Sequence, residues 1–422
     1  MRGLFLTLSL ACLGCCCVIW ARAAQERGQG DASITLFLSG QEQGQLKPCG
    51  CSGGQLGGLE RRGAIFDQVS RSRRLVINTG SIVDAETEQN LIKFPVFLQA
   101  FSLLGYDVLH LTARDLQIER LTGALAGLDP SVSVITAEPV GESQASSFTR
   151  SFSLGGREVA IRVIAVNAQT TLSSLREASQ VRVFILDSAD EDLVHSVLEI
   201  ATAEDCVVVP SELDDPKVFD FPAAQAQVLS VGRRGRHVGR LDIRPRVGGD
   251  GLELRFREIK VSQELINDPL LVDLYKSYQG IVRDSQLMDS VVRVPLPEGG
   301  RFAGSSRCQD CHEEVYAIWQ DRGHAHAYGT LVKVGSDMDP ECVVCHVVGM
   351  EFEEGFVSLE KTPQFPDVGC EVCHGPGADH VVSGGSIDLG QPRRSCLHCH
   401  KPEHSGEFAE HREEYREKIK HW

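Results

Sequence analysis

The sequence predicts two domains of different fold class, an α/β layered sandwich followed by a mainly α, loop-rich domain. Short apolar runs alternate with helix-like stretches from about residue 33 to residue 245, which is typical of a layered domain with a buried sheet. Proline and glycine interrupt this pattern at residues 295–300. Beyond Arg301 strand-like runs almost disappear, and this part holds eight of the 15 cysteines and 11 of the 14 histidines. We therefore expect the second domain to lack a conventional apolar core.

The length and composition of the chain are those of an ordinary globular protein. Its 422 residues are enough for two or three domains with a sizeable core. Hydrophobic residues make up 42% and charged residues 24%, which excludes a disordered or collagen-like chain. The formal net charge of −16 argues against a nucleic-acid-binding protein, because binding to phosphates needs a cationic surface.

The first 23 residues have the pattern of a secretory signal peptide. Arg2 gives a positive start, residues 4–20 are apolar and uncharged, and Ala21-Arg22-Ala23 matches a cleavage site. A permanent membrane anchor is the alternative, although the apolar run is short for a membrane span. We expect an exported protein, periplasmic or extracellular, and leave open whether it is associated with a membrane.

The first domain, residues 31–260, contains β-branched runs that predict strands. These runs lie at residues 34–38, 75–78, 108–111, 132–135, 159–164, 181–186 and 206–209. The stretches that predict helices lie between them, at residues 58–71, 89–104 and 191–203. This alternation predicts a buried sheet covered by helices.

Residues 261–300 are predicted to form a helical connector and a linker. Asp268 followed by Pro269 is the pattern of an N-cap residue with proline in the first helical turn. Apolar residues then recur at helical spacing from Leu271 onwards, which predicts one long amphipathic helix ending near Met288. Residues 301–422 make up the second domain.

The second domain carries four copies of one pattern, in which two cysteines three residues apart are followed directly by a histidine. Thiols at this spacing form thioether bonds to the two vinyl groups of one haem, and the adjacent histidine binds the iron from one face. The pattern therefore predicts four haem c groups. The attachment cysteines are Cys308, Cys311, Cys342, Cys345, Cys370, Cys373, Cys396 and Cys399, and the proximal iron ligands are His312, His346, His374 and His400.

Zinc knuckles and dithiol redox sites also use cysteines at this spacing, but neither requires a histidine directly after the second cysteine. The second iron ligand matters for function, because methionine gives a higher redox potential than a second histidine. Only two methionines, Met338 and Met350, follow Arg301, whereas seven histidines there lie outside the proximal positions. We therefore expect mostly bis-histidine ligation and low potentials.

From about Ser305 to the end, the chain resembles the cytochrome c-554 family of tetrahaem cytochromes. The resemblance rests on residues 319–328, 339–349 and 368–380, the last of which reads VGCEVCHGPGADH. It implies distal iron ligands at His324 (or His326) and at His380, and His404 and His421 are the other two candidates. Members of the family pack their haems closely and pass electrons, and one iron can lack a distal ligand.

Residues from about 31 to 260 resemble the 5′-nucleotidase-like, calcineurin-like metallophosphoesterases, on segments 34–51, 57–62, 78–80 and 232–242. The metal-binding motifs of that family are replaced here. Gln41-Glu42-Gln43-Gly44 stands for Asp-x-His-Gly, Gly80-Ser81 for Gly-Asp, and Thr112-Ala113-Arg114-Asp115 for Gly-Asn-His-Asp/Glu; His195 and His237 are isolated. A two-metal site needs carboxylates and imidazoles close together. The resemblance thus implies a phosphoesterase fold that has lost its metal ligands.

Three cysteines belong to neither the leader nor the haem motifs. A single residue separates Cys49 from Cys51. This spacing is tight for an internal disulfide, because neighbouring side chains of a strand point apart. The two could form a structural pair, bind a metal, pair with Cys206 or contact the haem domain.

These observations favour an exported multihaem cytochrome that relays electrons, with the first domain as a non-catalytic docking module. The alternative is a haem enzyme that acts on a small nitrogen or sulfur compound, such as nitrite, hydroxylamine or nitric oxide, at an open iron. An active nucleotidase or phosphatase is a third possibility, which the replaced ligands disfavour. The acidic charge predicts a cationic redox partner, and neighbouring cytochromes or a quinol-linked membrane complex are candidate partners.

Overall fold

The computed structural model describes residues 33–48, 54–138, 145–176, 180–222, 224–390, 392, 394–401, 405, 408 and 410–421. The chain divides into two compact units. The α/β unit comprises the described residues up to Gln45 together with Arg61–Asp84 and Phe101–Val261. The C-terminal unit comprises Leu46–Glu60, Ala85–Ala100 and the described residues from Ser262 onwards. The predicted signal peptide, Cys49 and Cys51 lie outside the described residues.

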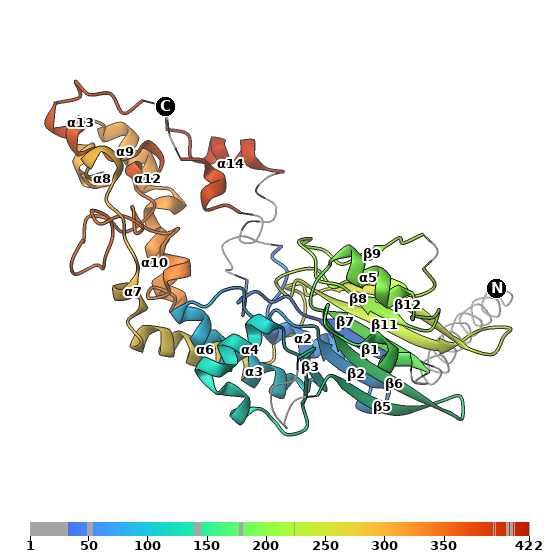
Figure 1. Cartoon of the computed structure of the whole chain (residues 1–422). Coiled ribbons are helices and arrows are strands. Elements are labelled where there is room, and N and C mark those ends of the chain that lie inside the picture. Colours follow the sequence, from blue (N-terminus) through green and yellow to red (C-terminus); the bar gives the residue numbers. More distant parts are fainter. Residues whose placement is uncertain are drawn as a thin grey trace, which may run out of the picture. The chain divides into compact units, whose positions relative to one another are not determined.

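The described part of the α/β unit contains two six-stranded mixed sheets (Figure 1). The first has the order β12-β11-β1-β2-β3-β4. Strands β1 to β4 are parallel to one another, β11 is antiparallel to β1, and β12 is antiparallel to β11. Its strands are β1 (Ile34–Ser39), β2 (Arg74–Asn78), β3 (Val108–His110), β4 (Ser133–Ile135), β11 (His237–Pro245) and β12 (Leu252–Lys260).

The second sheet has the order β5-β6-β7-β8-β10-β9, with β6, β7, β8 and β10 parallel and an antiparallel strand at each edge. Its strands are β5 (Ser147–Leu154), β6 (Arg157–Val166), β7 (Val181–Leu186), β8 (Cys206–Val208), β9 (Lys217–Phe219) and β10 (Gln227–Ser230).

The core of the α/β unit lies between the two sheets and on their outer faces. In β7, Val181, Val183 and Ile185 belong to the apolar cluster shared by both sheets, whereas Phe184 and Leu186 belong to a second cluster with helix α5 (Glu191–Leu198). Successive strand residues point to opposite faces, so a strand buried on both faces is apolar throughout. On the first sheet, the ring of Phe66 in helix α2 (Leu59–Phe66) lies 5.3 Å from that of Phe37 in β1. The predicted α/β layered sandwich is confirmed.

Most of the remaining helices are short, and the two longer ones are α3 (Glu88–Leu104) and α6 (Pro269–Asp284). The others are α4 (Ala113–Thr122), α7 (Leu287–Ser290), α8 (Ser305–Gln309), α9 (Glu313–Gln320), α10 (Ala327–Val334), α11 (Pro340–Val343), α12 (Cys370–His374), α13 (Ala378–Val382) and α14 (Arg412–Lys418). Short 3₁₀ helices lie at Arg71–Arg73, Ala124–Gly127, Leu172–Arg176, Pro297–Gly299, Gly323–His326 and Cys396–His398. Among the described residues, no helix is long and apolar enough to cross a membrane.

The long helix predicted after Asp268 is interrupted. Asp268 caps α6 as expected, since its carboxylate accepts the N–H of Leu270 at 2.9 Å. However, α6 ends at Asp284, and Gln286 has a φ of 56°, outside the right-handed helical region, before α7 begins. Apolar spacing alone did not reveal this break, because Leu287 and Met288 are apolar and buried like the apolar residues of α6 before them.

The expectation that the second domain lacks a conventional apolar core was wrong. A cluster of buried apolar side chains lies in the C-terminal unit, around Val343, Val347, Met350 and Phe356. These residues lie within or after the second cysteine motif and have no strand or helix periodicity, so the sequence pattern did not reveal them. Met350 is only 3% exposed within this cluster, and its side chain therefore serves packing.

An ion pair between a buried histidine and a partly exposed aspartate joins the two sheets of the α/β unit. His110 ends β3 in the first sheet, Asp187 follows β7 in the second, and His110 Nε2 lies 2.9 Å from Asp187 Oδ1. On its other side, His110 Nδ1 donates to the carbonyl of Thr79 at 3.1 Å. Burial alone would lower the pKa of His110, but its interactions with Asp187, the Thr79 carbonyl and the charge of Asp115 together outweigh burial, so that its pKa is raised.

We expect the stability of this unit to fall as the pH rises. The raised pKa means that the pair stabilises the fold below the unfolded histidine pKa of about 6.5 and that this contribution is lost as the pH rises through the folded value. Amide exchange of β3 and β7, corrected for intrinsic rates, should therefore be less protected at alkaline pH. The Asp187→Asn variant should lose this pH dependence; an unchanged dependence in the variant would contradict the assignment.

Candidate haem site

Each cysteine motif folds as a single helical turn. The N–H of His312 donates to the carbonyl of Cys308 at 2.9 Å, and the N–H of His400 donates to that of Cys396 at 2.9 Å. The third motif is helix α12 itself. One turn separates residues four apart, so the first cysteine and the histidine lie on the same face of the turn. This local conformation suits the attachment of two thiols and one imidazole to the same haem.

Three of the four motif histidines face a second histidine from elsewhere in the C-terminal unit. The ring centroids are 6.2 Å apart in each case. The pairs are His312 with His380, His400 with His324, and His374 with His421. The partners lie on α13, on the 3₁₀ helix Gly323–His326 and after α14, far apart in the sequence.

This spacing fits one metal ion held between two imidazoles. Two metal–nitrogen bonds of about 2.0 Å, together with the distance of about 1.1 Å from each ring centre to its nitrogen, span about 6.2 Å. A direct stacking contact would bring the rings closer than this, as for His400 and Phe408 at 4.3 Å. The donor set and its spacing therefore fit a haem iron with two axial histidines.

Backbone contacts orient these imidazoles for metal binding. Nδ1 donates to a carbonyl in His346 (Ala327, 2.7 Å), His380 (Ile387, 2.6 Å) and His421 (Ile419, 2.8 Å). A carbonyl only accepts, so the proton must be on Nδ1, and the lone pair on Nε2 is left for the iron. Such second contacts of a ligating histidine fix its tautomer and ring orientation.

The protonation of the paired histidines also suits metal binding. Burial lowers the pKa of His324, and the nearby His400 and His346 lower it further. Burial likewise lowers the pKa of His374, with a further contribution from His421. The neutral imidazole is the form that binds a metal, so both side chains are in the ligating state at neutral pH.

The structure distinguishes among the other candidate ligands. His326 is exposed, and the ring facing His400 is that of His324, two residues earlier. His404 lies outside the described residues. Within the described part of the chain, no second histidine ring faces His346.

Attachment cysteines of different motifs lie next to one another. A hydrogen bond with the Cys370 thiol is the main cause that raises the pKa of Cys308, and one with the Cys345 thiol raises that of Cys399. Burial, followed by the charge of Cys396, raises the pKa of Cys373. The motifs therefore adjoin in the order first, third, fourth, second.

Three side chains that the sequence analysis missed hold these motifs in place. Glu371, within the third motif, is 3% exposed, and its carboxylate accepts the N–H groups of Ala303, Gly304 and Gly377 at 2.7–2.8 Å. The indole N–H of Trp319 donates to the carbonyl of Val368 at 3.0 Å. No sequence signal marks Glu371, because the two residues between the cysteines differ among the four motifs of this chain.

Asp339 is the third missed residue, and it caps the turn that carries the second motif. Its carboxylate accepts the N–H of Glu341 at 3.0 Å, and Pro340 occupies the first helical position. The Asp-Pro pattern that predicted the start of α6 could also have identified this cap.

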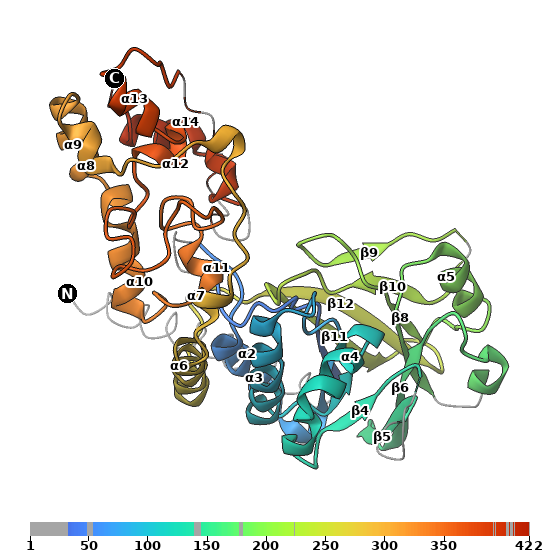
Figure 2. The ribbon, with the colours of Figure 1, turned by 60° about the vertical axis from the view of Figure 1, so that its left-hand side comes forward.

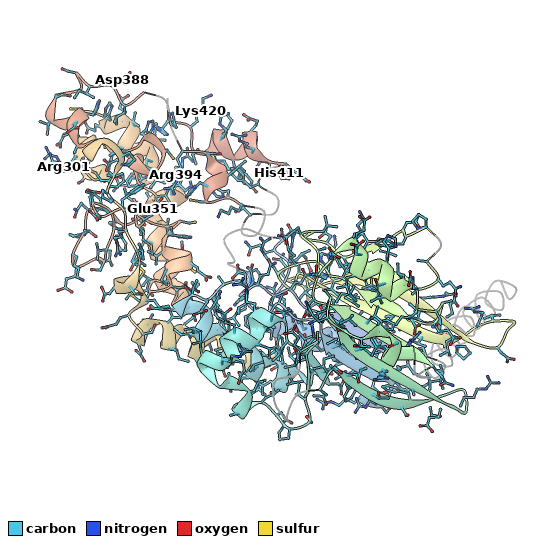
Figure 3. All side chains as sticks on the ribbon, in the orientation of Figure 1. Arg301, Glu351, Asp388, Arg394, His411 and Lys420 are labelled. Atoms are coloured by element: carbon cyan, nitrogen blue, oxygen red, sulfur yellow. The ribbon has the colours of Figure 1, made fainter. Side chains whose placement is uncertain are left out.

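An ion pair fixes the loops around the second and fourth motifs. Arg394 precedes the fourth motif, and its guanidinium lies 2.7 Å from the carboxylate of Glu351, which follows the second (Figure 3). The backbone N–H of Arg394 also donates to the carbonyl of Cys373 at 3.3 Å. Arg394 thus contacts segments belonging to three motifs.

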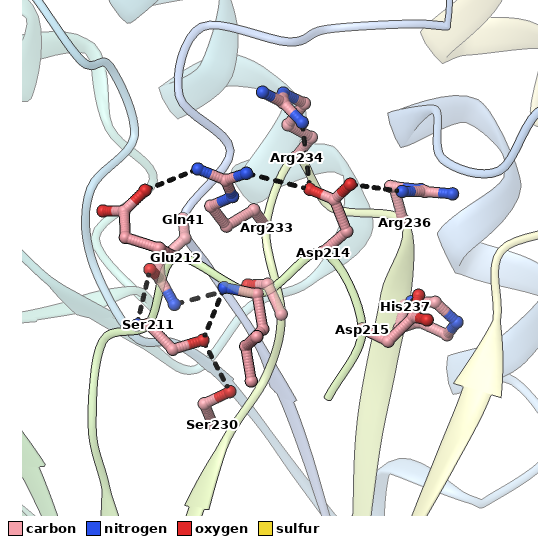
Figure 4. Close-up of polar contacts among 12 residues, drawn as sticks. Gln41, Ser211, Glu212, Asp214, Asp215, Ser230, Arg233, Arg234, Arg236 and His237 are labelled. Carbon is pink, nitrogen blue, oxygen red and sulfur yellow. Dashed lines mark hydrogen bonds and ion pairs between the residues drawn. The ribbon is translucent and has the colours of Figure 1, made fainter. Parts of the chain in front are cut away.

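In the α/β unit, the side chains at the positions that correspond to the family's metal ligands are hydrogen-bonded to other groups of the protein. The side chain of Gln41 accepts the N–H of Ser211 at 3.1 Å and donates to the carbonyl of Gly232 at 3.3 Å, beside the arginines around Asp214 (Figure 4). Asp115 accepts the N–H groups of Ser81 and Ile82, both at 2.9 Å. These polar groups hold loops at the ends of the strands.

Glu42 lies in a fully buried ion pair. Arg62 Nη1 is 2.8 Å from Glu42 Oε1, and both side chains are 0% exposed. Tyr106 and Asn78 complete the network, with hydrogen bonds to Arg62 at 2.9 Å and to Glu42 at 3.1 Å. Burial alone would lower the pKa of Arg62, but Tyr106 and Glu42 outweigh it and raise the pKa. Within the described residues, no cluster of three or more His, Cys, Asp or Glu side chains could hold a metal ion.

Cysteine pairs followed by histidine, with imidazoles paired at the span of one metal ion, are the features of a c-type cytochrome. Residues 307–375 match the family model described as "Cytochrome c554 and c-prime". Cytochrome c-554 of Nitrosomonas europaea is 33% identical in an alignment covering 21% of this chain and 45% of that protein. The chain thus spans less than half the length of this relative. The predicted resemblance of the C-terminal part to the cytochrome c-554 family is confirmed.

Solved structures similar to this chain include phosphoesterases. One is a 5′-nucleotidase precursor from Thermus thermophilus, with 16% identity, a TM-score of 0.45, and coverage of 62% of this chain and 61% of that one. Another is the sulfate thiohydrolase SoxB of Thermus thermophilus, with 14% identity, a TM-score of 0.46 and coverage of 63% and 62%.

Proposed function

We propose that this protein is an exported tetrahaem cytochrome c that relays electrons, with the α/β unit as a non-catalytic docking module. The observation that carries the proposal is the set of three histidine pairs, each with ring centroids 6.2 Å apart and each containing one motif histidine. Bound haems supply one-electron transfer at the potential that their axial ligands set. The signal-peptide pattern supports export, because c-type haem is attached outside the cytoplasm.

The neighbouring attachment cysteines support close packing of the four groups. The first motif adjoins the third, the third adjoins the fourth, and the fourth adjoins the second. This order differs from the order in the sequence. The chain therefore provides one continuous series of attachment sites, with the first and second motifs at its two ends.

The internal hydrogen bonds of Gln41, Glu42 and Asp115 support a non-catalytic α/β unit. Catalysis by two metal ions requires side chains that are free to coordinate them. Here the carboxylate of Glu42 is paired with a guanidinium, and the carboxylate of Asp115 accepts hydrogen bonds from backbone N–H groups. The net charge of −16 supports docking to a cationic redox partner through long-range attraction.

Paramagnetic resonance of the oxidised protein, with haem counting by mass, tests this proposal. We expect four haems, at least three of them low-spin with two histidine ligands. The His324→Ala variant should keep four haems but convert one low-spin signal, that of the haem held by His400, to high spin. The matched control His326→Ala should leave all signals unchanged. A wild-type protein with fewer than four haems, or variants with the opposite behaviour, would refute the proposal.

A second function depends on His346, which faces no other histidine ring among the described residues, while the candidate His404 lies outside them. An iron held there by one histidine would have an open face, where a small nitrogen or sulfur compound could bind. Nitrite, hydroxylamine or nitric oxide should then perturb a high-spin signal. Four low-spin signals would exclude this second function and leave electron relay.

A further inference from the structure

Two carboxylates on the turn that carries the second motif are bound by side chains from distant parts of the chain. Asp339 and Glu341 lie at the start of α11, and Cys342 follows Glu341 directly. Their partners come from the first half of α3 and from α6, which belong to the same compact unit as α11 (Figure 2). Neither helix lies within residues 307–375, the part that matches the cytochrome family.

Asp339 is held by a closed set of hydrogen bonds. The amide of Gln89 donates to Asp339 Oδ1 at 2.7 Å, and the hydroxyl of Tyr278 donates to Oδ2 at 3.2 Å. The same amide reaches the Tyr278 hydroxyl at 2.8 Å, and all three side chains are at most 7% exposed. Because buried polar groups are costly to leave unpaired, this set fixes α11 against α3 and α6.

Glu341 is held by a charged partner on α3. Lys93 Nζ lies 2.6 Å from both carboxylate oxygens. The Lys93 side chain is 6% exposed, whereas that of Glu341 is 56% exposed. The positive charge is thus shielded from water, and the negative charge is screened by it.

The buried ammonium is bound to the residue that directly precedes the first cysteine of the second motif. Glu341 and Cys342 are consecutive, so their Cα atoms are about 3.8 Å apart. Burial, and then the Cys342 thiol, raise the pKa of Tyr275 of α6. This tyrosine therefore also lies near the second motif. A positive charge in a poorly screened position favours the addition of an electron to a neighbouring group.

We propose that Lys93 sets the redox potential of the haem bound by Cys342, Cys345 and His346, acting through its ion pair with Glu341. Gln89 and Tyr278 are positioning residues that keep this pair next to the haem by holding Asp339. The inference rests on the proposed function, since it requires a haem at the second motif. It assigns to helices outside the cytochrome-like part a direct effect on one particular haem.

A charge-neutralisation series tests the proposal on the full, haem-loaded chain. The signal of this haem is first assigned by its loss in the Cys342→Ala/Cys345→Ala variant. In a potentiometric titration, Lys93→Met should lower the midpoint potential of this haem and leave the other three unchanged. Glu341→Gln should raise it by a smaller amount, because the carboxylate is better screened. The double variant should lie between Lys93→Met and the wild type.

The control is Lys361→Met, the same substitution at an exposed ion pair of the same unit. Lys361 lies 3.4 Å from Asp289, and both side chains are 62% exposed. This variant should leave all potentials unchanged. If the wild type carries four haems and Lys93→Met does not move the assigned potential, the inference is wrong. If no haem is bound at Cys342 and Cys345, the proposed function itself fails.

Discussion

Replacement of both Cys370 and Cys373 by alanine is expected to remove one haem and to divide the remaining three into unequal groups. Without thioether bonds, no covalent link holds the third haem. Cys370 adjoins Cys308 and Cys373 adjoins Cys396, so the third motif connects the first to the fourth. Intact mass should fall by one haem, and the haem at the first motif should exchange electrons with the others far more slowly in rapid-mixing reduction.

The matched control is Cys206→Ala, which removes a cysteine outside the motifs. Cys206 is fully buried in β8, within the cluster between the sheets. Its removal should leave the haem count and the reduction kinetics as in the wild type. If the double variant retains a full set of haems, or if the first haem is still reduced together with the rest, the order of motifs inferred here is wrong.

Replacement of Arg62 by leucine is expected to destabilise the α/β unit by about 3–5 kcal/mol. Removing one partner of a buried ion pair leaves an uncompensated charge in a poorly polarisable environment. Here that charge is Glu42, which is 0% exposed and, among the described residues, would keep a side-chain hydrogen bond from the amide of Asn78 alone. The loss is measurable by denaturant unfolding, with amide exchange in β1 and β2 to assign it to this unit.

Two further variants separate the buried charge from the loss of packing. The double variant Glu42→Gln/Arg62→Leu should be destabilised less than Arg62→Leu alone, because no buried charge is left unpaired. Arg255→Leu removes an exposed arginine, 61% exposed and paired with Glu253 at 3.0 Å, and should not measurably change stability. Equal effects of Arg62→Leu and Arg255→Leu would contradict this account.

Much of the α/β fold could be predicted from the sequence, because its central strands are apolar on both faces. The runs at residues 34–38 and 181–186 correspond to β1 and β7 within a residue. The strands that escaped prediction include β5 and β12, which carry exposed polar residues at many positions. Their pairing is decided by neighbours distant in sequence, such as β6 for β5 and β11 for β12.

The candidate site divides in the same way. Cysteine spacing and the adjacent histidine are local, so the proposed attachment sites and proximal ligands could be predicted from the sequence. The proposed distal ligands depend on contacts between segments, and the preference for His324 over His326 rests on the ring that faces His400. The same holds for Lys93, which lies 248 residues before the carboxylate that it binds.

The sequence by itself determined the c-type cytochrome character of the second domain and the α/β class of the first. Each depends on residue identity and on spacing within a few positions, which the chain carries locally. Only the tertiary structure decided which histidines pair, in which order the motifs adjoin, and which side chains surround the second motif. These depend on long-range packing, where many weak contacts act together and no short stretch of sequence contains the answer.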